Sequence, residues 1–289
     1  MTRLSLEEQV EKCQKIHDTL AEYWNWAYYN TPHGGCSWLL SEYVKQLKPD
    51  VERRGPIIIQ ELEEFVEQHR VNPFNILDVG CGVGGFIHKA LSRLSEKHPE
   101  TEIKATGIDI SSKMIESALK NLRGLNVELV CDSITKRDLK LKNEPFDVAI
   151  LMVTLSFYND ESAREILSAI HNKLKKDGCL MVMDFAWSYR WGSVRLFSKP
   201  LQKVTDMFFS HLIGESFHFE NRAEDQLKAL LNDAGFDVTK SYLSEKKSKF
   251  KGMLVIVARR ETEMQELPAE LEVPKEETQL VVELHAKNV

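Results

Sequence analysis

The chain has 289 residues, of which 43% are hydrophobic and 28% charged, the composition of an ordinary globular protein. Its formal net charge of −6 is the opposite of the basic footprint that a nucleic-acid surface requires. No transmembrane helix is expected, since no run of about 18 apolar residues occurs, and the first residues lack the apolar core of a signal peptide. The five cysteines form no C-x-x-C pair, which indicates free thiols in a reducing compartment. We therefore expect a cytoplasmic protein with no nucleic-acid partner and no membrane span.

Residues 4–70 are predicted to be mainly helical. Apolar positions recur at helical spacing in residues 6–24 and again from residue 55 to residue 70. The aromatic-rich stretch between them, residues 22–38, is expected to be a break, because a Thr-Pro pair and a Gly-Gly pair interrupt any helix there.

From Asn75 the pattern changes to strands alternating with helices. The expected strands are residues 75–79, 103–110, 127–132, 146–153 and 179–185. Helical patterns lie between them, and the last of these is expected to end in the KKDG segment, with Gly178 as its stop. Such alternation is typical of a parallel sheet covered by helices.

The C-terminal part differs. After a helix that stops at Gly235, two strands, residues 237–243 and 252–258, are joined by a short polar loop. A connection this short cannot be a parallel crossover, so an antiparallel hairpin is expected. Residues 261–289 are acidic and contain two prolines, which predicts a mostly disordered tail.

The stretch NILDVGCGVGGFIHKAL, Asn75–Leu91, joins the first strand to a helix through a glycine-rich turn. Gly80, Gly82 and Gly85 fit the G-x-G-x-x-G dinucleotide fingerprint, while Gly80, Gly82 and Gly84 fit G-x-G-x-G, which indicates a different nucleoside. In either case the glycines allow a sharp turn and a close backbone approach, and the following helix directs its free N–H groups toward the ligand.

Acids at three successive strand ends distinguish the two cofactors. Asp78 would repel a pyrophosphate but attract an ammonium group. Asp109 can accept both ribose hydroxyls, a contact that NAD sites share. Asp132 offers an acceptor where an adenine amino group would lie. Together they favour a methionine-bearing nucleoside over NAD, which remains the alternative.

The segments ILDVGCGVGG, GIDIS, CDS and FDVAILMVTLSFY resemble, in this order, the motifs of class I S-adenosylmethionine-dependent methyltransferases of the small-molecule type. The resemblance covers residues 74–258 and implies a three-layer α/β/α Rossmann-like fold with S-adenosyl-L-methionine as cofactor. The implied sheet has seven mostly parallel strands and ends in the antiparallel hairpin. The implied division is a helical N-terminal cap at 1–72 and a methyltransferase domain at 73–260. Carried over by position, the cofactor-binding residues are Asp78, Gly80, Cys81, Gly82, Gly84, Asp109, Ile110, Met114, Asp132, Ser133 and Leu155.

The methyl acceptor is expected to be a small organic molecule. Aromatic residues are frequent in residues 23–38 and in an insertion at 187–219, which the resemblance implies to be an acceptor lid. His33 and Tyr158 are the candidate catalytic residues, each with an ordinary structural role as its alternative. No metal is expected, since the spaced acids of a magnesium-dependent site are absent. A protein or RNA methyltransferase, or a member that binds the cofactor without methylating, stays open, as do the acceptor and the oligomeric state.

Overall fold

The computed structural model describes residues 4–29, 55–185, 220, 222–243 and 253–261. His33, the predicted lid at 187–219 and the predicted tail beyond residue 261 lie outside these residues. Within them, no helix is long and apolar enough to cross a bilayer.

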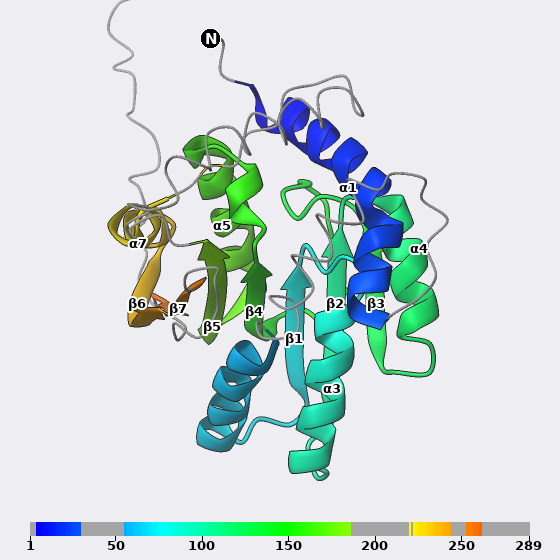
Figure 1. The fold of residues 1–289 in the computed structure, drawn as a ribbon. Coiled ribbons are helices and arrows are strands. Elements are labelled where there is room, and N and C mark those ends of the chain that lie inside the picture. Colours follow the sequence, from blue (N-terminus) through cyan, green and yellow to red (C-terminus); the bar gives the residue numbers. More distant parts are fainter. Residues whose placement is uncertain (1–3, 30–54, 186–219, 221, 244–252, 262–289) are drawn as a thin grey trace, which may run out of the picture.

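A seven-stranded sheet forms the centre of the fold, in the order β3-β2-β1-β4-β5-β7-β6 (Figure 1). The strands are β1 (Phe74–Val79), β2 (Ile103–Asp109), β3 (Val127–Cys131), β4 (Phe146–Met152), β5 (Leu174–Phe185), β6 (Phe236–Leu243) and β7 (Met253–Arg260). β1 to β5 run parallel, whereas β7 is antiparallel to both of its neighbours, β5 and β6. The predicted mostly parallel sheet with a C-terminal antiparallel hairpin is confirmed.

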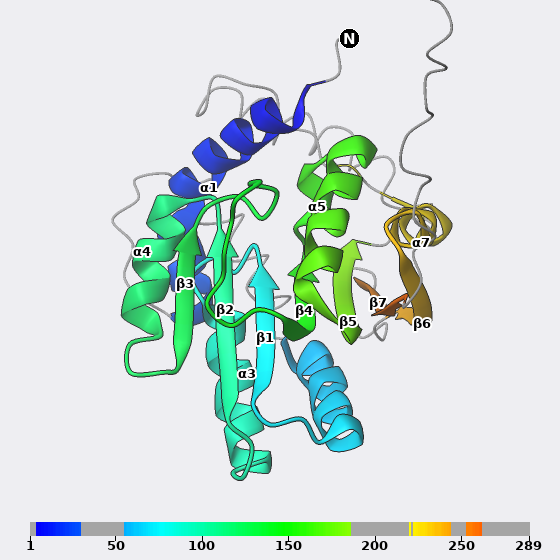
Figure 2. The same cartoon turned by 180° about the vertical axis from the view of Figure 1, so that it is seen from behind.

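Helices cover both faces of the sheet (Figures 1 and 2). The described helices are α1 (Leu6–Tyr29), a helix of residues 55–69, α3 (Gly85–Lys97), α4 (Ser112–Asn121), α5 (Asp160–Lys173) and α7 (Glu224–Asp233), with a 3-10 turn η1 (Leu155–Phe157) after β4. The helix of residues 55–69, α3 and α4 pack on one face, and α5 and α7 on the other. Because both faces are covered, most residues of β1 and β4 are apolar, as in other inner parallel strands.

The order of the strands reverses at β1, since β2 lies on one side of it and β4 on the other. The crossover helices after β1 and β4 therefore lie on opposite faces, which leaves a crevice beyond the carboxyl ends of these strands. Figure 1 shows α1 lying on this side, toward which the arrowheads point.

Two predicted boundaries were wrong. Residues 22–29 belong to α1 and are not a break, because the Pro and Gly that interrupt helices come only after Asn30. The helix α5 ends at Lys173, five residues before Gly178, and Leu174 already pairs with Phe146. A register shift between Phe146 and Val148 accommodates the KKDG segment, so main-chain pairing prevails over the stop signal.

Candidate functional site

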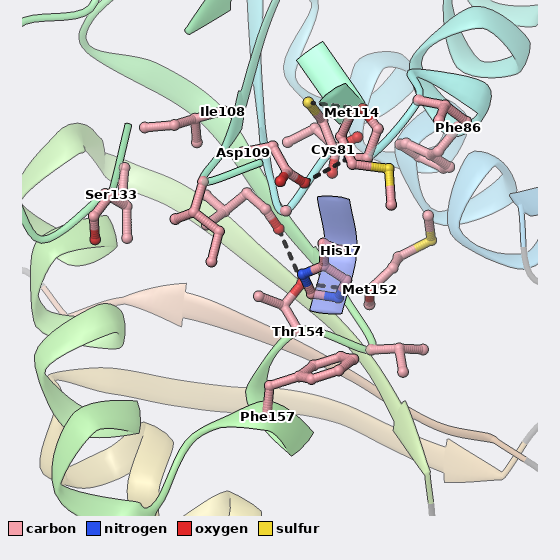
Figure 3. Close-up of a pocket in the computed structure, with 18 of the residues that line it drawn as sticks. His17, Cys81, Phe86, Ile108, Asp109, Met114, Ser133, Met152, Thr154 and Phe157 are labelled. Carbon is pink, nitrogen blue, oxygen red and sulfur yellow. Dashed lines mark hydrogen bonds between the residues drawn. The ribbon is translucent and has the colours of Figure 1, made fainter. Parts of the chain in front are cut away.

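A pocket lies at the carboxyl ends of β1, β2, β3 and β4 (Figure 3). Its floor is the glycine turn, in which Gly80, Gly82 and Gly84 all have positive φ angles, of 78°, 53° and 79°. A Cβ on Gly80 would lie 2.5 Å from Thr154 Oγ1, so a side chain there is excluded by both space and backbone conformation. The turn therefore presents bare backbone to the pocket.

Asp109, at the end of β2, holds the glycine turn in place. Its Oδ2 accepts a hydrogen bond from Gly82 N at 2.9 Å, and its Oδ1 accepts one from Ser111 N at 2.9 Å. Each carboxylate oxygen can accept a further bond from a ligand, because an ionised carboxyl has about four acceptor positions. Burial raises the pKa of Asp109 above its ordinary value, and the neighbouring His17 opposes this shift.

Asp78, at the end of β1, is the most unusual side chain of the pocket. It is 2% exposed, and its Oδ2 makes no hydrogen bond with any described residue. Burial, and then the charge of Asp109, raise the pKa of Asp78 to about 7. A buried carboxylate oxygen without a donor is costly and rare in folded proteins. This oxygen therefore has an unused acceptor position beside the glycine turn.

The far end of the pocket is apolar with polar edges. Ile110 and Met114 line it, and the Ser111 hydroxyl caps α4 by accepting from Met114 N at 3.2 Å. Asp132 accepts from Ser133 N at 2.9 Å through Oδ1, and its Oδ2 binds Lys136 Nζ at 2.5 Å. This end suits a flat heterocycle with hydrogen-bonding edges.

The helix α1 contributes a wall to the pocket, and the sequence predicted its aromatic residues near the site but not His17. His17, Trp24 and Tyr28 line the pocket, and their spacing of seven and four residues puts them on one helical face. This spacing is the signal for a common helical face, but the predicted break at residues 22–38 leaves Trp24 and Tyr28 outside any predicted helix. A Cβ on Gly85 would lie 2.0 Å from Tyr28 Cδ1 and would clash with it. The absence of a side chain at Gly85 therefore allows α1 to pack closely against the glycine turn.

Several hydrogen bonds along its length hold α1 over the pocket. The Ser111 hydroxyl donates to Asp18 at 2.5 Å, Asn121 Nδ2 donates to Asn25 at 2.7 Å, and Gln9 Nε2 donates to Ser162 at 2.8 Å. The partners lie around α4 and on α5, at opposite sides of the crevice. The helix thus spans the opening.

The segment after β4 forms the remaining wall, with Met152, Val153, Thr154, Phe157 and Tyr158 as lining residues. Val153 has a φ of 57°, a conformation that β-branched residues rarely adopt and that occurs preferentially at ligand sites. The Tyr158 side chain hydrogen-bonds that of Cys13, and burial raises the pKa of Tyr158 well above its ordinary value.

The predicted cofactor residues lie together, with two exceptions. All of them line the pocket except Gly84, which caps α3, and Leu155, whose carbonyl accepts from Arg222 Nη1 at 2.9 Å. Of the two candidate catalytic residues, Tyr158 lines the pocket and His33 is outside the described residues. The described part of the chain contains no cluster of His, Cys, Asp and Glu able to hold a metal ion.

Comparisons with known proteins agree with the fold. Residues 76–178 match a family model described as a methyltransferase domain. The chain is 28% identical over 152 residues to a carboxy-S-adenosyl-L-methionine synthase of Idiomarina loihiensis, covering 50% of this chain and 59% of that protein. It is 34% identical over 111 residues to a malonyl-[acyl-carrier protein] O-methyltransferase of Acetivibrio thermocellus, covering 38% of this chain and 35% of that protein. The matches thus span about half the length of such relatives or less.

Among solved structures, the magnesium protoporphyrin IX methyltransferase of Synechocystis PCC 6803 with bound S-adenosylhomocysteine has the same fold. The TM-score is 0.61 at 18% identity, over 87% of this chain and 99% of that one. Residues 76–178 are thus similar to the methyltransferase domain family, and the described part of the chain has the Rossmann-like fold of S-adenosylmethionine-dependent methyltransferases.

Proposed function

We propose that this protein transfers the methyl group of S-adenosylmethionine to a small organic acceptor. The observation that carries the proposal is the unpaired, buried Oδ2 of Asp78 beside the glycine turn, with Asp109 at the end of the next strand. An ammonium group would supply the missing donor, whereas a pyrophosphate would be repelled by the carboxylate.

The chain's own residues fit each part of the cofactor. Asp78 would bind the ammonium of the methionine portion, and Asp109 would accept from the ribose hydroxyls. Ile110 and Met114 would enclose the adenine, with Asp132 and Ser133 at its polar edge. When bound, the cofactor supplies an electrophilic methyl group on a sulfonium. The protein's part is to align the acceptor with that methyl group and to exclude water.

The walls of the pocket support a small acceptor. The helix α1 covers the opening with Trp24 and Tyr28, and Phe157 stands on the opposite wall. Aromatic walls of this kind enclose an apolar or planar body, whereas a folded protein or RNA needs an open approach. The net charge of −6 adds an argument against RNA. Free thiols at Cys13, Cys81, Cys131 and Cys179 support a reducing, cytoplasmic setting.

Two experiments test the proposal in turn. Calorimetric titration should show binding of S-adenosylmethionine and S-adenosylhomocysteine and no binding of NAD. Incubation of the protein and methyl-tritiated S-adenosylmethionine with a metabolite extract should then label a small molecule, which mass spectrometry identifies. Binding of NAD alone would contradict the cofactor assignment, and label found only in protein or RNA would contradict the small acceptor.

Asp109→Ala is expected to weaken the binding of S-adenosylhomocysteine by about 2–4 kcal/mol, because two bonds to a charged acceptor are lost. That loss corresponds to a dissociation constant roughly 30- to 1000-fold higher. Calorimetry measures the constant, and thermal unfolding shows that the variant is folded. Asp138→Ala, which removes an exposed carboxylate outside the pocket, is the control and should bind as the wild type does. An unchanged dissociation constant for Asp109→Ala would contradict the proposal that Asp109 binds the ribose hydroxyls.

A further inference from the structure

The imidazole of His17 stands inside the pocket, between Asp109 and the wall after β4 (Figure 3). Its ring meets that of Phe157 edge to face, with ring centroids 4.7 Å apart. Its nitrogens make no hydrogen bond with another described residue, and the side chain is only partly covered from the pocket space. A ring nitrogen is therefore available to a bound molecule.

The surroundings of His17 favour a neutral ring that can become charged. Burial lowers the pKa of His17 below its ordinary value of 6.5, so the ring carries a free lone pair at neutral pH. The charges of Asp109 and Asp18 act in the opposite direction. They would stabilise an imidazolium formed during a reaction, as a carboxylate does beside a catalytic histidine. Titratable groups face this region from every packed element. They are Cys13 and Asp18 on α1, Asp78 on β1 and Cys81 after it, Asp109 on β2, Cys131 on β3 and Asp132 after it, and Tyr158 after β4.

The other titratable groups of the pocket are less suited to accept a proton. Tyr158 stays protonated at neutral pH, because burial raises its pKa well above 10 and it bonds Cys13. Burial likewise raises the pKa of the Cys81 thiol. Asp132 is paired with Lys136, and Asp78 and Asp109 line the part of the pocket that the proposed function assigns to the cofactor.

We propose that His17 is the general base of the methyl transfer, and that the acceptor carries its nucleophile as a hydroxyl, a phenol or an amine. This rests on the proposed function. The acceptor's oxygen or nitrogen forms the bond to the methyl carbon, and the electron pair of the broken carbon–sulfur bond goes to sulfur. The O–H or N–H proton passes to the free nitrogen of His17, and the imidazolium later releases it to water. A carboxylate acceptor would need no base and is excluded.

The test compares His17→Asn with the wild type, using methyl-tritiated S-adenosylmethionine and the acceptor fraction isolated from the extract. We expect kcat at pH 7 to fall by about 10²- to 10⁴-fold, the range for loss of a positioned base. The dissociation constant of S-adenosylhomocysteine should stay within about twofold. A residue that only accepts a proton during the reaction contributes to kcat and not to the binding of this product. The matched control is His69→Asn, on the helix of residues 55–69 and outside the pocket, which should leave kcat unchanged.

Two further readouts separate a base from a merely structural residue. The wild-type kcat at saturating cofactor should fall along an acid limb that lies below the ordinary histidine pKa of 6.5, as the ring becomes protonated, and this limb should be absent from His17→Asn. Added imidazole should restore part of the activity of His17→Ala. Unchanged kcat in His17→Asn, a tenfold loss of S-adenosylhomocysteine affinity, a retained acid limb, or a methyl ester as the labelled product would each overturn the proposal. Wild-type protein that binds no S-adenosylhomocysteine would instead overturn the proposed function.

Discussion

Replacing Asp78 by asparagine is expected to weaken cofactor binding while making the cofactor-free protein more stable at pH 8. The folded protein holds the pKa of this carboxyl at about 7, above its ordinary value of 3.8. Between these values the unfolded chain releases the proton before the folded chain does, so stability falls as the pH rises. The difference of about three between the folded and unfolded pKa values corresponds to about 4 kcal/mol of stability. This stability is fully lost above pH 7.

The asparagine variant avoids this loss because its amide does not ionise. Its melting temperature at pH 8 should exceed that of the wild type by roughly 8–16 °C, since each kcal/mol corresponds to roughly 2–4 °C. The difference should shrink steadily as the pH is lowered through 3.8, below which the wild-type carboxyl is mostly protonated in both states. Calorimetric scans of the cofactor-free proteins at several pH values measure it.

Cofactor affinity should change in the opposite direction. Loss of a charge-assisted bond to the ammonium is expected to raise the dissociation constant of S-adenosylmethionine about 10²-fold at pH 8. The wild-type constant should rise tenfold per unit as the pH falls below 7, and the constant of the variant should not.

Asp147→Asn is the matched control for Asp78→Asn. Asp147 is equally buried, but it is bonded to Asn75 N at 2.8 Å and to Lys175 at 2.7 Å, outside the pocket. Its replacement should destabilise the protein and leave cofactor affinity unchanged. If Asp78→Asn were less stable than the wild type at pH 8, or bound the cofactor equally well, the assignment of Asp78 would be wrong.

Arg222→Met is expected to cost about 2–5 kcal/mol of stability. The guanidinium is 7% exposed and donates to Leu155 O at 2.9 Å, to Tyr158 O at 2.6 Å and to Asp160 at 2.9 Å. Without it, two carbonyls of the wall after β4 lose their donors, each at about 1–3 kcal/mol. Asp160 is mostly exposed and remains hydrated. The melting temperature should fall by roughly 10 °C.

The same substitution should loosen one wall of the pocket and spare the other. The segment after β4 is also bound by Glu220 N, which donates to Ser156 O at 2.8 Å, and by Cys13, whose thiol donates to Phe157 O at 3.8 Å. Arg222 is the charged member of this set, so its loss should raise the KM of the acceptor more than the dissociation constant of S-adenosylhomocysteine.

Arg164→Met is the matched control for this prediction. Arg164 pairs with Asp233 at 3.1 Å, and both side chains are about half exposed. Exposed pairs of this kind contribute about 0–1 kcal/mol. Unfolding in urea measures both variants, and equal losses of stability would show that the buried contacts of Arg222 do not stabilise the wall.

The sequence by itself determined the sheet, the glycine turn and the acids at the strand ends. These are local features: a strand buried on both faces must be apolar along its length, and a turn with positive φ angles must contain glycine. Asp78, Asp109 and Asp132 were found because each directly follows or ends a strand, and parallel strands bring their carboxyl ends together.

Only the tertiary structure decided which distant segments close the site. Nothing local in α1 shows that His17, Trp24 and Tyr28 face the glycine turn, since an apolar or aromatic helical face packs equally well on any partner. From the sequence, Arg222 is indistinguishable from an ordinary solvent-exposed arginine. Only the structure shows that its guanidinium donates hydrogen bonds to two carbonyls of the wall after β4. The unpaired oxygen of Asp78 likewise depends on burial by segments far away in the chain. The burial of a side chain and its hydrogen-bond partners depend on the complete tertiary structure. They in turn determine which groups of the site are charged and which can accept a proton.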